Sequence, residues 1–262
     1  MWNRVEIKKT AKSRLKSYQG KAILVCLIIV ILEWLPEMFK NDKFVGMLES
    51  IITIHPNLTE DGLSNYVMFC TNLISPKGTL ETILSDIPLF GLVVGFILFR
   101  LILTYLIITP LKVGQKAFFY KNQSEEQGID ELAYAFDARF YKNITKTEFI
   151  AYMHIWFYTL LFIIPGIVCS FSYYFVSYIL VDQPLMSTKD ALDLSKKMTD
   201  GHKKEIFVYV LSFIGWYILS MLTFGITDIL YGIPYRQAAD AELYTELKRL
   251  YNSKLIECVE SE

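Results

Sequence analysis

The longest apolar segment of the chain covers residues 149–182, and no Lys, Arg, Asp or Glu lies between its two ends. A helix that crosses a bilayer needs about 20 apolar residues, so the segment is long enough for two helices and too long for one. Pro165 and Gly166 interrupt it near its centre, and a Pro-Gly pair is a typical turn signal. We therefore predict a hairpin of two membrane-spanning helices, over residues 147–164 and 166–182, with Pro165 and Gly166 at the turn.

Four further apolar stretches predict membrane-spanning helices, which gives about six in all. They cover residues 22–36, 88–110, 205–224 and 226–244. The last stretch contains acidic and basic residues and a proline, and an alternative with five spans omits it. The predicted fold class is all-α: a polytopic membrane helical bundle of about six transmembrane helices with flanking amphipathic helices, in a single domain over residues 1–262.

The segments between the spans are more polar. Residues 1–21 are basic and predict a helix on the cytoplasmic membrane surface. Its apolar face would be formed by Trp2, Val5, Ala11, Leu15 and Tyr18. Residues 37–87 are predicted to form an external loop, and residues 111–146 and 183–204 to form cytoplasmic loops with short helices. In the second of these loops, Ser187 is a predicted helix N-cap.

The placement of the Lys and Arg residues orients the predicted spans. Seven lie in the N-terminal arm, six in the first predicted cytoplasmic loop, five in the second and three in the C-terminal tail, whereas three lie in the predicted external loop. Cytoplasmic loops of membrane proteins carry an excess of basic residues. We therefore expect a multi-pass protein with both termini in the cytoplasm. The net charge of −1 gives no reason to expect nucleic acid as a partner.

The composition agrees with a membrane protein, because 53% of the residues are hydrophobic and the mean hydropathy is +0.34. The four cysteines show no CxxC spacing, so neither a disulfide framework nor a metal site is predicted. Phosphate-binding loops and the HExxH and GxSxG motifs are absent from the sequence. No catalytic, cofactor-binding or metal-binding residue is predicted, and no cofactor.

Charged residues inside the predicted spans are candidates for function, because a charge in the bilayer is costly and is usually paired. At about 1.5 Å per residue, Glu33 and Arg100 fall at a similar predicted depth. We predict a buried ion pair between them, extended by Arg236 and Asp240 of the last span into a cluster of zero net charge. Such a cluster either fixes the register of the helices or forms a site for a substrate, an ion or a proton.

Two classes of function fit these observations. The first is a protein without catalytic activity of its own, in envelope transport or as an accessory or scaffold of a membrane complex. The alternative is an intramembrane enzyme for lipid or lipid-linked substrates, which requires ionisable side chains to converge in a pocket, for example His154 with Asp182 or Asp240. The expected partners are the lipid bilayer and, as open alternatives, other membrane proteins or an apolar or lipid ligand held by the aromatic residues of the hairpin.

The second half of the chain carries five pieces that together resemble a known family. They are LLFIIPGIV at 160–168, SYYFVSYILVDQP at 172–184, ALDLSKKMTDGHKKEIF at 191–207, LSFIGWYILSMLTFGI at 211–226 and GIPYRQAADAELY at 232–244. In their order and spacing the chain resembles the bacterial integral membrane proteins catalogued as domain of unknown function 975. The resemblance implies a multi-helix protein of the bacterial cell membrane and implies no activity. More remotely, the chain is similar to the membrane region attached to some glycerophosphodiester phosphodiesterases.

Overall fold

The computed structural model describes residues 2–38, 95 and 98–260, and all regular secondary structure in these residues is helical. Met1–Ile31 and Tyr105–Glu262 form one compact unit, and Leu32–Thr104 form a second. The first unit contains the candidate site and is described by itself. Almost all of the predicted external loop lies outside the described residues. That the two units form a single domain stays a prediction.

Four helical stretches of the described residues are long and apolar enough to cross a membrane. They are Arg4–Glu33, Leu98–Lys121, Ile163–Asp182 and Lys203–Leu222. Each overlaps one of the predicted spans. The other two predicted spans, 147–164 and 226–244, lie mainly in helices α6 and α12, which are not among the four. The chain is thus an all-helical protein with four candidate membrane-spanning helices in its described part.

The first helix, α1 (Arg4–Met38), buries one face against other helices of the first unit. The buried residues recur every three or four positions; they are Ile7, Ala11, Leu15, Tyr18, Ala22, Val25, Cys26 and Ile29. The N-terminal part of this face contacts protein, since the Trp2 ring meets the Tyr209 ring edge-on at 6.1 Å. That residues 1–21 lie at the cytoplasmic membrane surface stays a prediction. Val5, predicted on the apolar face, is exposed.

Helix α5 (Thr109–Lys121) continues the preceding helical residues through a π-helical segment, η1 (Thr104–Ile108). The sequence predicted that this span ends at Pro110. In a helix, proline lacks an N–H and its ring clashes with the carbonyl four residues earlier. That carbonyl belongs to Leu106, and it accepts a hydrogen bond from the Tyr141 hydroxyl at 2.8 Å. The wider π-helical turn and this donor from another helix allow the helix to pass Pro110. The helix therefore continues into residues 111–121, the start of the segment predicted as a cytoplasmic loop with short helices.

The 3₁₀ helix η2 (Ile129–Phe136) approaches α5 closely at Gly114. A Cβ atom on Gly114 would lie 2.2 Å from the carbonyl oxygen of Leu132 and 2.7 Å from its carbonyl carbon. Both obstacles are backbone atoms, which cannot rotate away. The contact between α5 and η2 therefore requires glycine at this position.

We expect Gly114→Ala to lower the free energy of unfolding by about 1–3 kcal/mol, because the two backbones must separate to admit the methyl group. The control is Gly20→Ala in α1, where an added Cβ meets no atom within 4 Å. That change should leave stability unchanged or raise it, since alanine favours a helix over glycine by about 1 kcal/mol. Thermal unfolding in detergent compares the two variants. Equal melting temperatures would contradict the close packing.

The predicted hairpin is present, but its turn lies elsewhere. It consists of α6 (Tyr141–Leu161), α7 (Ile163–Ser172) and α8 (Val176–Asp182). The chain reverses at Phe162, whose backbone is extended (φ −155°, ψ 141°), so the prediction of Pro165 and Gly166 as the turn is wrong. Both lie in the first turn of α7, where a proline costs little because the first N–H groups of a helix have no partner in the helix. Gly166 allows close packing, since its Cβ would lie 2.2 Å from Thr159 Oγ1.

Two connections between helices expose large apolar side chains. At the α6–α7 turn, Leu160 to Ile164 are each between 59% and 76% exposed. The second turn follows α10 (Lys203–Leu211) and α11 (Ile214–Leu222), where Met221 and Phe224 are 84% and 96% exposed. Continuous exposed apolar surface of this kind marks a contact with another apolar phase or partner.

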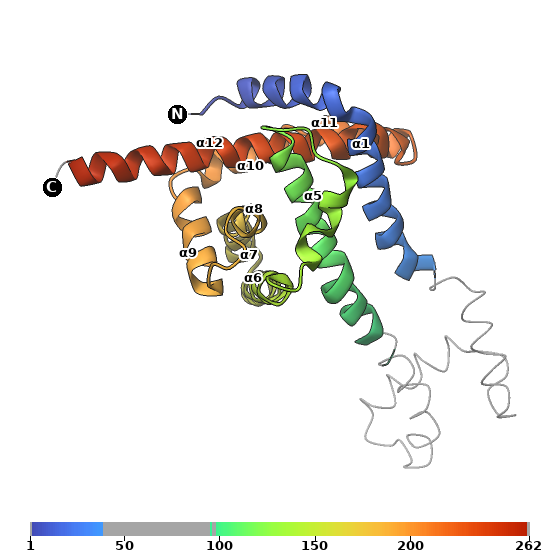
Figure 1. Cartoon of the computed structure of the whole chain (residues 1–262), viewed down its shortest axis with the longest axis horizontal. Helices are drawn as coiled ribbons and strands as arrows, with labels where there is room; N and C mark the ends of the chain where they lie inside the picture. The colour runs from blue at the N-terminus through green and yellow to red at the C-terminus, as the bar shows by residue number, and fades with distance from the viewer. Residues whose placement is uncertain (1, 39–94, 96–97, 261–262) are drawn as a thin grey trace, which may run out of the picture. The chain divides into compact units, whose positions relative to one another are not determined.

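The remaining helices complete the frame around the candidate site. Helix α9 (Thr188–Thr199) begins as predicted, because the backbone N–H of Asp190 donates to the hydroxyl of the N-cap Ser187 at 3.2 Å. Helix α12 (Ile233–Glu260) follows a second π-helical segment, η3 (Asp228–Gly232). In Figure 1 α12 is the long helix beside the N-terminal part of α1, and Arg14 forms an ion pair with Glu242 at 2.7 Å.

Candidate functional site

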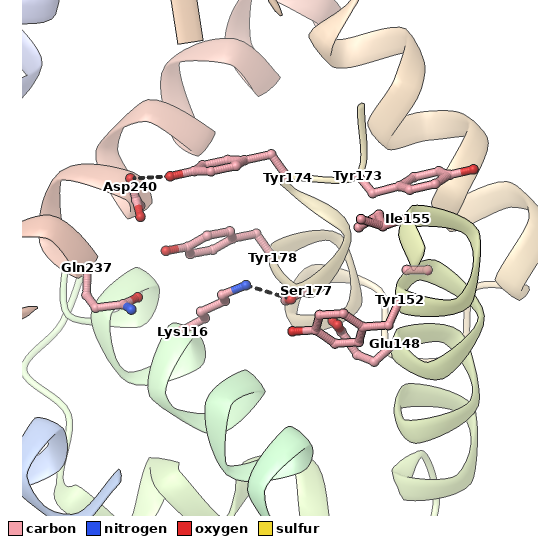
Figure 2. Close-up of a pocket in the computed structure, with 11 residues that line it drawn as sticks. Lys116, Glu148, Tyr152, Ile155, Tyr173, Tyr174, Ser177, Tyr178, Gln237 and Asp240 are labelled. Carbon is pink, nitrogen blue, oxygen red and sulfur yellow. Dashed lines mark hydrogen bonds between the residues drawn. The ribbon is translucent and has the colours of Figure 1, made fainter. Parts of the chain in front are cut away.

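A cavity of about 220 Å³ lies between helices α5, α6, α7, α8 and α12 (Figure 2). Its volume corresponds to roughly seven water molecules at about 30 Å³ each. The lining residues are Lys116 of α5, Glu148, Ala151, Tyr152 and Ile155 of α6, Tyr173, Tyr174, Ser177 and Tyr178 of the α7–α8 segment, and Gln237 and Asp240 of α12. The wall is thus aromatic and carries three ionisable groups of both signs.

Lys116 is the basic group of the cavity. Its neighbours in α5, Ala117, Phe118 and Phe119, are fully buried and hold this part of the helix in the core. The Nζ atom of Lys116 donates a hydrogen bond to the hydroxyl oxygen of Ser177 at 2.7 Å, and Figure 2 shows the two side chains meeting at the cavity. The ammonium group is therefore fixed in position and available to an anionic group.

Asp240 is one of the two acidic groups. Its Oδ1 atom accepts hydrogen bonds from the hydroxyl of Tyr174 at 3.0 Å and from that of Tyr209 at 2.9 Å. Both hydroxyls donate to the same carboxylate oxygen, so the Asp240 side chain is held in place by two tyrosines.

Glu148 is the other acidic group, and it lacks the partners that Asp240 has. It is buried, and its Oε1 atom has no hydrogen-bond partner. The hydroxyl of Tyr178 and Oε1 of Gln237 are likewise buried without a partner. A buried polar group without a partner costs about 1–3 kcal/mol and needs an explanation. Among the described residues, three of the six such atoms line this one cavity, which indicates a space for a ligand or for water.

Arg236 is not part of the cavity wall but lies one turn before Asp240. It forms a bidentate ion pair with Asp228, in which Nη1 lies 2.7 Å from Oδ1 and Nη2 lies 2.9 Å from Oδ2. Its guanidinium carbon lies 4.4 Å from the centre of the Tyr217 ring. The sequence predicted Arg236 and Asp240 as an extension of a Glu33–Arg100 pair. The structure shows Asp228 in contact with Arg236, and two tyrosine hydroxyls in contact with Asp240.

The other part of the predicted cluster belongs to the second unit of the chain, which contains Glu33 and Arg100. Their pairing, and the cluster of four charges, stay predictions. The combination proposed for an enzyme, His154 with Asp182 or Asp240, is not assembled. His154 Nδ1 lies 3.2 Å from the Tyr173 hydroxyl, and Asp182 binds the Tyr244 hydroxyl and Lys248 Nζ. Neither His154 nor Asp182 is among the residues that line the cavity.

Sequence reasoning missed four polar residues of the cavity: Lys116, Glu148, Ser177 and Gln237. Lys116 was counted as a basic residue of a cytoplasmic loop, although its apolar neighbours Ala117 to Phe119 are a signal that it is buried. Glu148 directly precedes the long segment without charges. An acidic residue beside such an apolar segment is a signal that its carboxylate is buried. Ser177 and Gln237 give no such signal, because serine and glutamine occur equally on exposed helix faces.

The described residues form an all-helical protein with four helices long and apolar enough to cross a membrane, and a polar cavity lies between its helices. These features define a helical protein of a class compatible with a membrane location. The chain belongs to the family described as "Protein of unknown function (DUF975)", whose model matches residues 1–251. No curated protein and no solved structure matches the chain. The more remote similarity to the membrane region of glycerophosphodiester phosphodiesterases stays an expectation.

Proposed function

We propose that the chain is a multi-pass protein of the bacterial cell membrane that binds a small polar ligand in its cavity and acts in envelope transport, without catalytic activity of its own. The observation that carries this proposal is the set of partnerless buried oxygens of Glu148, Tyr178 and Gln237 around one cavity. A scaffold gains nothing from such a costly arrangement, whereas a binding site recovers the cost when its ligand is bound.

The membrane placement is part of the same proposal. Lys203–Leu222 contains 20 residues, which at 1.5 Å per residue is about 30 Å and equals the thickness of the hydrocarbon core. Helix α6 and the start of α12 would complete two helical hairpins with α7–α8 and with α10–α11, which brings the total to about six spans. Both termini would lie in the cytoplasm, where the basic residues of the predicted loops gather.

The competing hypothesis is a scaffold or accessory protein whose polar cavity is sealed from water. Cysteine labelling distinguishes a transport protein from such a scaffold. Ser177→Cys places a thiol in the cavity wall, and Ser195→Cys places one at a fully buried position outside it. Both variants carry the same serine-to-cysteine change in a background where the native cysteines are replaced by alanine.

We expect a small water-soluble thiol reagent, aminoethyl methanethiosulfonate, to label Ser177→Cys in native membranes at least about tenfold faster than Ser195→Cys. The physical reason is that the cavity admits polar molecules, whereas the surroundings of Ser195 are packed. Labelling of both thiols at the same slow rate would mean a sealed cavity, and the transport proposal would give way to a scaffold.

A second candidate function is an intramembrane enzyme for lipid or lipid-linked substrates. It is favoured by the Lys116–Ser177 contact of 2.7 Å, because a lysine beside a serine is a known pairing of general base and nucleophile. A fluorophosphonate that reacts with activated serines tests it. Labelling that Ser177→Ala abolishes would support the enzyme, and the proposed transporter should show none.

A further inference from the structure

We infer that the cavity recognises a primary ammonium group on a small ligand that also carries an anionic group. This inference rests on the proposed binding function and names the chemistry of the ligand. The three partnerless side chains, Glu148, Tyr178 and Gln237, and the charged groups around them carry it.

The first step concerns donors and acceptors. Each of the three partnerless atoms in the cavity is an oxygen: a carboxylate oxygen of Glu148, an amide oxygen of Gln237 and the hydroxyl oxygen of Tyr178. A carboxylate or an amide oxygen only accepts hydrogen bonds, and a hydroxyl oxygen accepts as well as donates. The ligand that satisfies them must therefore supply N–H or O–H donors. A primary ammonium supplies three N–H donors on one atom.

The second step concerns charge. Among the described residues, Glu148 has no basic side chain within ion-pair distance, although the charge of Lys116 in the same cavity attracts it. A buried carboxylate without a contacting cation is unfavourable, so a positive group on the ligand is preferred over a neutral hydroxyl. The rings of Tyr152 and Tyr174 in the wall add to this preference because the face of an aromatic ring attracts a cation.

The third step concerns the other end of the ligand. Lys116 Nζ is held at the cavity by Ser177, and an ammonium group placed beside it would be repelled. An anionic group of the same ligand would be attracted there instead. Lys116 and Glu148 come from different helices, α5 and α6, and both face the cavity (Figure 2). The arrangement therefore fits a zwitterion with an ammonium at one end, and the volume of about 220 Å³ limits it to a small group.

Two kinds of molecule provide a small zwitterion with a primary ammonium group: a free solute such as phosphoethanolamine and the headgroup of phosphatidylethanolamine. A matched pair of probes isolates the ammonium group. Phosphoethanolamine and phosphocholine share the phosphate and the positive charge, but the quaternary nitrogen of phosphocholine carries no N–H donor. Binding to the purified full chain in phosphatidylcholine nanodiscs is measured by calorimetry.

We expect phosphoethanolamine to bind at least about tenfold more tightly than phosphocholine. The Glu148→Gln variant should lose roughly ten- to a hundredfold of that affinity, since a hydrogen bond to a charged group is worth more than one to a neutral group. The control Glu125→Gln, at an exposed position after α5, should bind as the wild type does. A second variant, Gln237→Met, removes one acceptor without touching a charge and should lose roughly fivefold.

A second experiment distinguishes the lipid headgroup from the free solute. Nanodiscs that contain phosphatidylethanolamine should raise the melting temperature of the wild type and not that of Glu148→Gln, if the ligand is the lipid headgroup. Binding of free phosphoethanolamine without this lipid effect identifies a soluble ligand, and either result supports the inference. Equal affinity for the two probes, or full affinity in both cavity variants, would overturn it. If phosphocholine alone binds, the ammonium inference fails and the binding function stands; if neither probe nor lipid binds, both fail.

Discussion

Replacing Arg236 with methionine is expected to lower the free energy of unfolding by about 3 kcal/mol, because the change leaves the carboxylate of Asp228 without its cation in a largely buried position. The two side chains are only 16% and 18% exposed, and both guanidinium nitrogens contact the carboxylate. Gly232 is part of the same arrangement, since a Cβ there would lie 2.1 Å from Asp228 Oδ1. The pair fixes the turn between α11 and α12.

The control for Arg236→Met is Arg139→Met, because Arg139 also pairs with an aspartate, Asp137, but its side chain is 79% exposed. An exposed ion pair contributes about 0–1 kcal/mol, so the control should unfold almost as the wild type does. Asp228→Asn added to Arg236→Met should recover part of the loss, because it removes the uncompensated charge. Thermal and denaturant unfolding in detergent measure all three variants. Equal losses in Arg236→Met and Arg139→Met would contradict the structural role of the pair.

Replacing Tyr244 with alanine is expected to cost about 3–5 kcal/mol, the usual range for truncation of a buried aromatic side chain. The Tyr244 ring is 2% exposed and stacks on the Tyr178 ring, with centroids 5.2 Å apart and an angle of 19° between the planes. It also contacts the Tyr120 ring at 5.3 Å, and its hydroxyl donates to Asp182. Because Tyr178 lines the cavity, this truncation removes support from the binding site as well as from the core.

Tyr244→Phe separates packing from hydrogen bonding. It keeps the ring and removes only the hydroxyl, so the expected loss is about 1–3 kcal/mol, and the Lys248 ammonium still pairs with Asp182 at 2.7 Å. Unfolding curves of the two variants and of the wild type provide the comparison. If the alanine variant were no less stable than the phenylalanine variant, ring packing between α8 and α12 would not be what stabilises this region.

Part of the fold follows directly from the sequence. Long runs without charges predict membrane-spanning helices, because only a helix satisfies its own backbone groups in lipid. The N-cap at Ser187 follows equally well, since capping depends on residues that are neighbours in sequence. The turn at Pro165–Gly166 was predicted wrongly, because the chain reverses three residues earlier, at Phe162. A proline in the first turn of a helix does not interrupt it, so the Pro-Gly pair alone did not locate the turn.

The candidate site was predictable to a much smaller extent. Asp240 was named from the sequence, because an acidic residue in an apolar stretch is unusual. Lys116, Glu148 and Gln237 were not, because the cavity collects residues from helices that are more than 100 positions apart in sequence. Their side chains have the composition of an exposed helix face. Only tertiary packing shows that they line one cavity and that oxygens of Glu148 and Gln237 lack partners.

The central claim is that the cavity holds a ligand, and a density map of the protein purified with its native lipids tests it most directly. An antibody fragment bound outside the cavity would give the particle the size that electron microscopy needs. We predict density larger than one water molecule in contact with the oxygens of Glu148, Tyr178 and Gln237. A cavity in which these side chains turn and pair with one another, with no density between them, would contradict the claim.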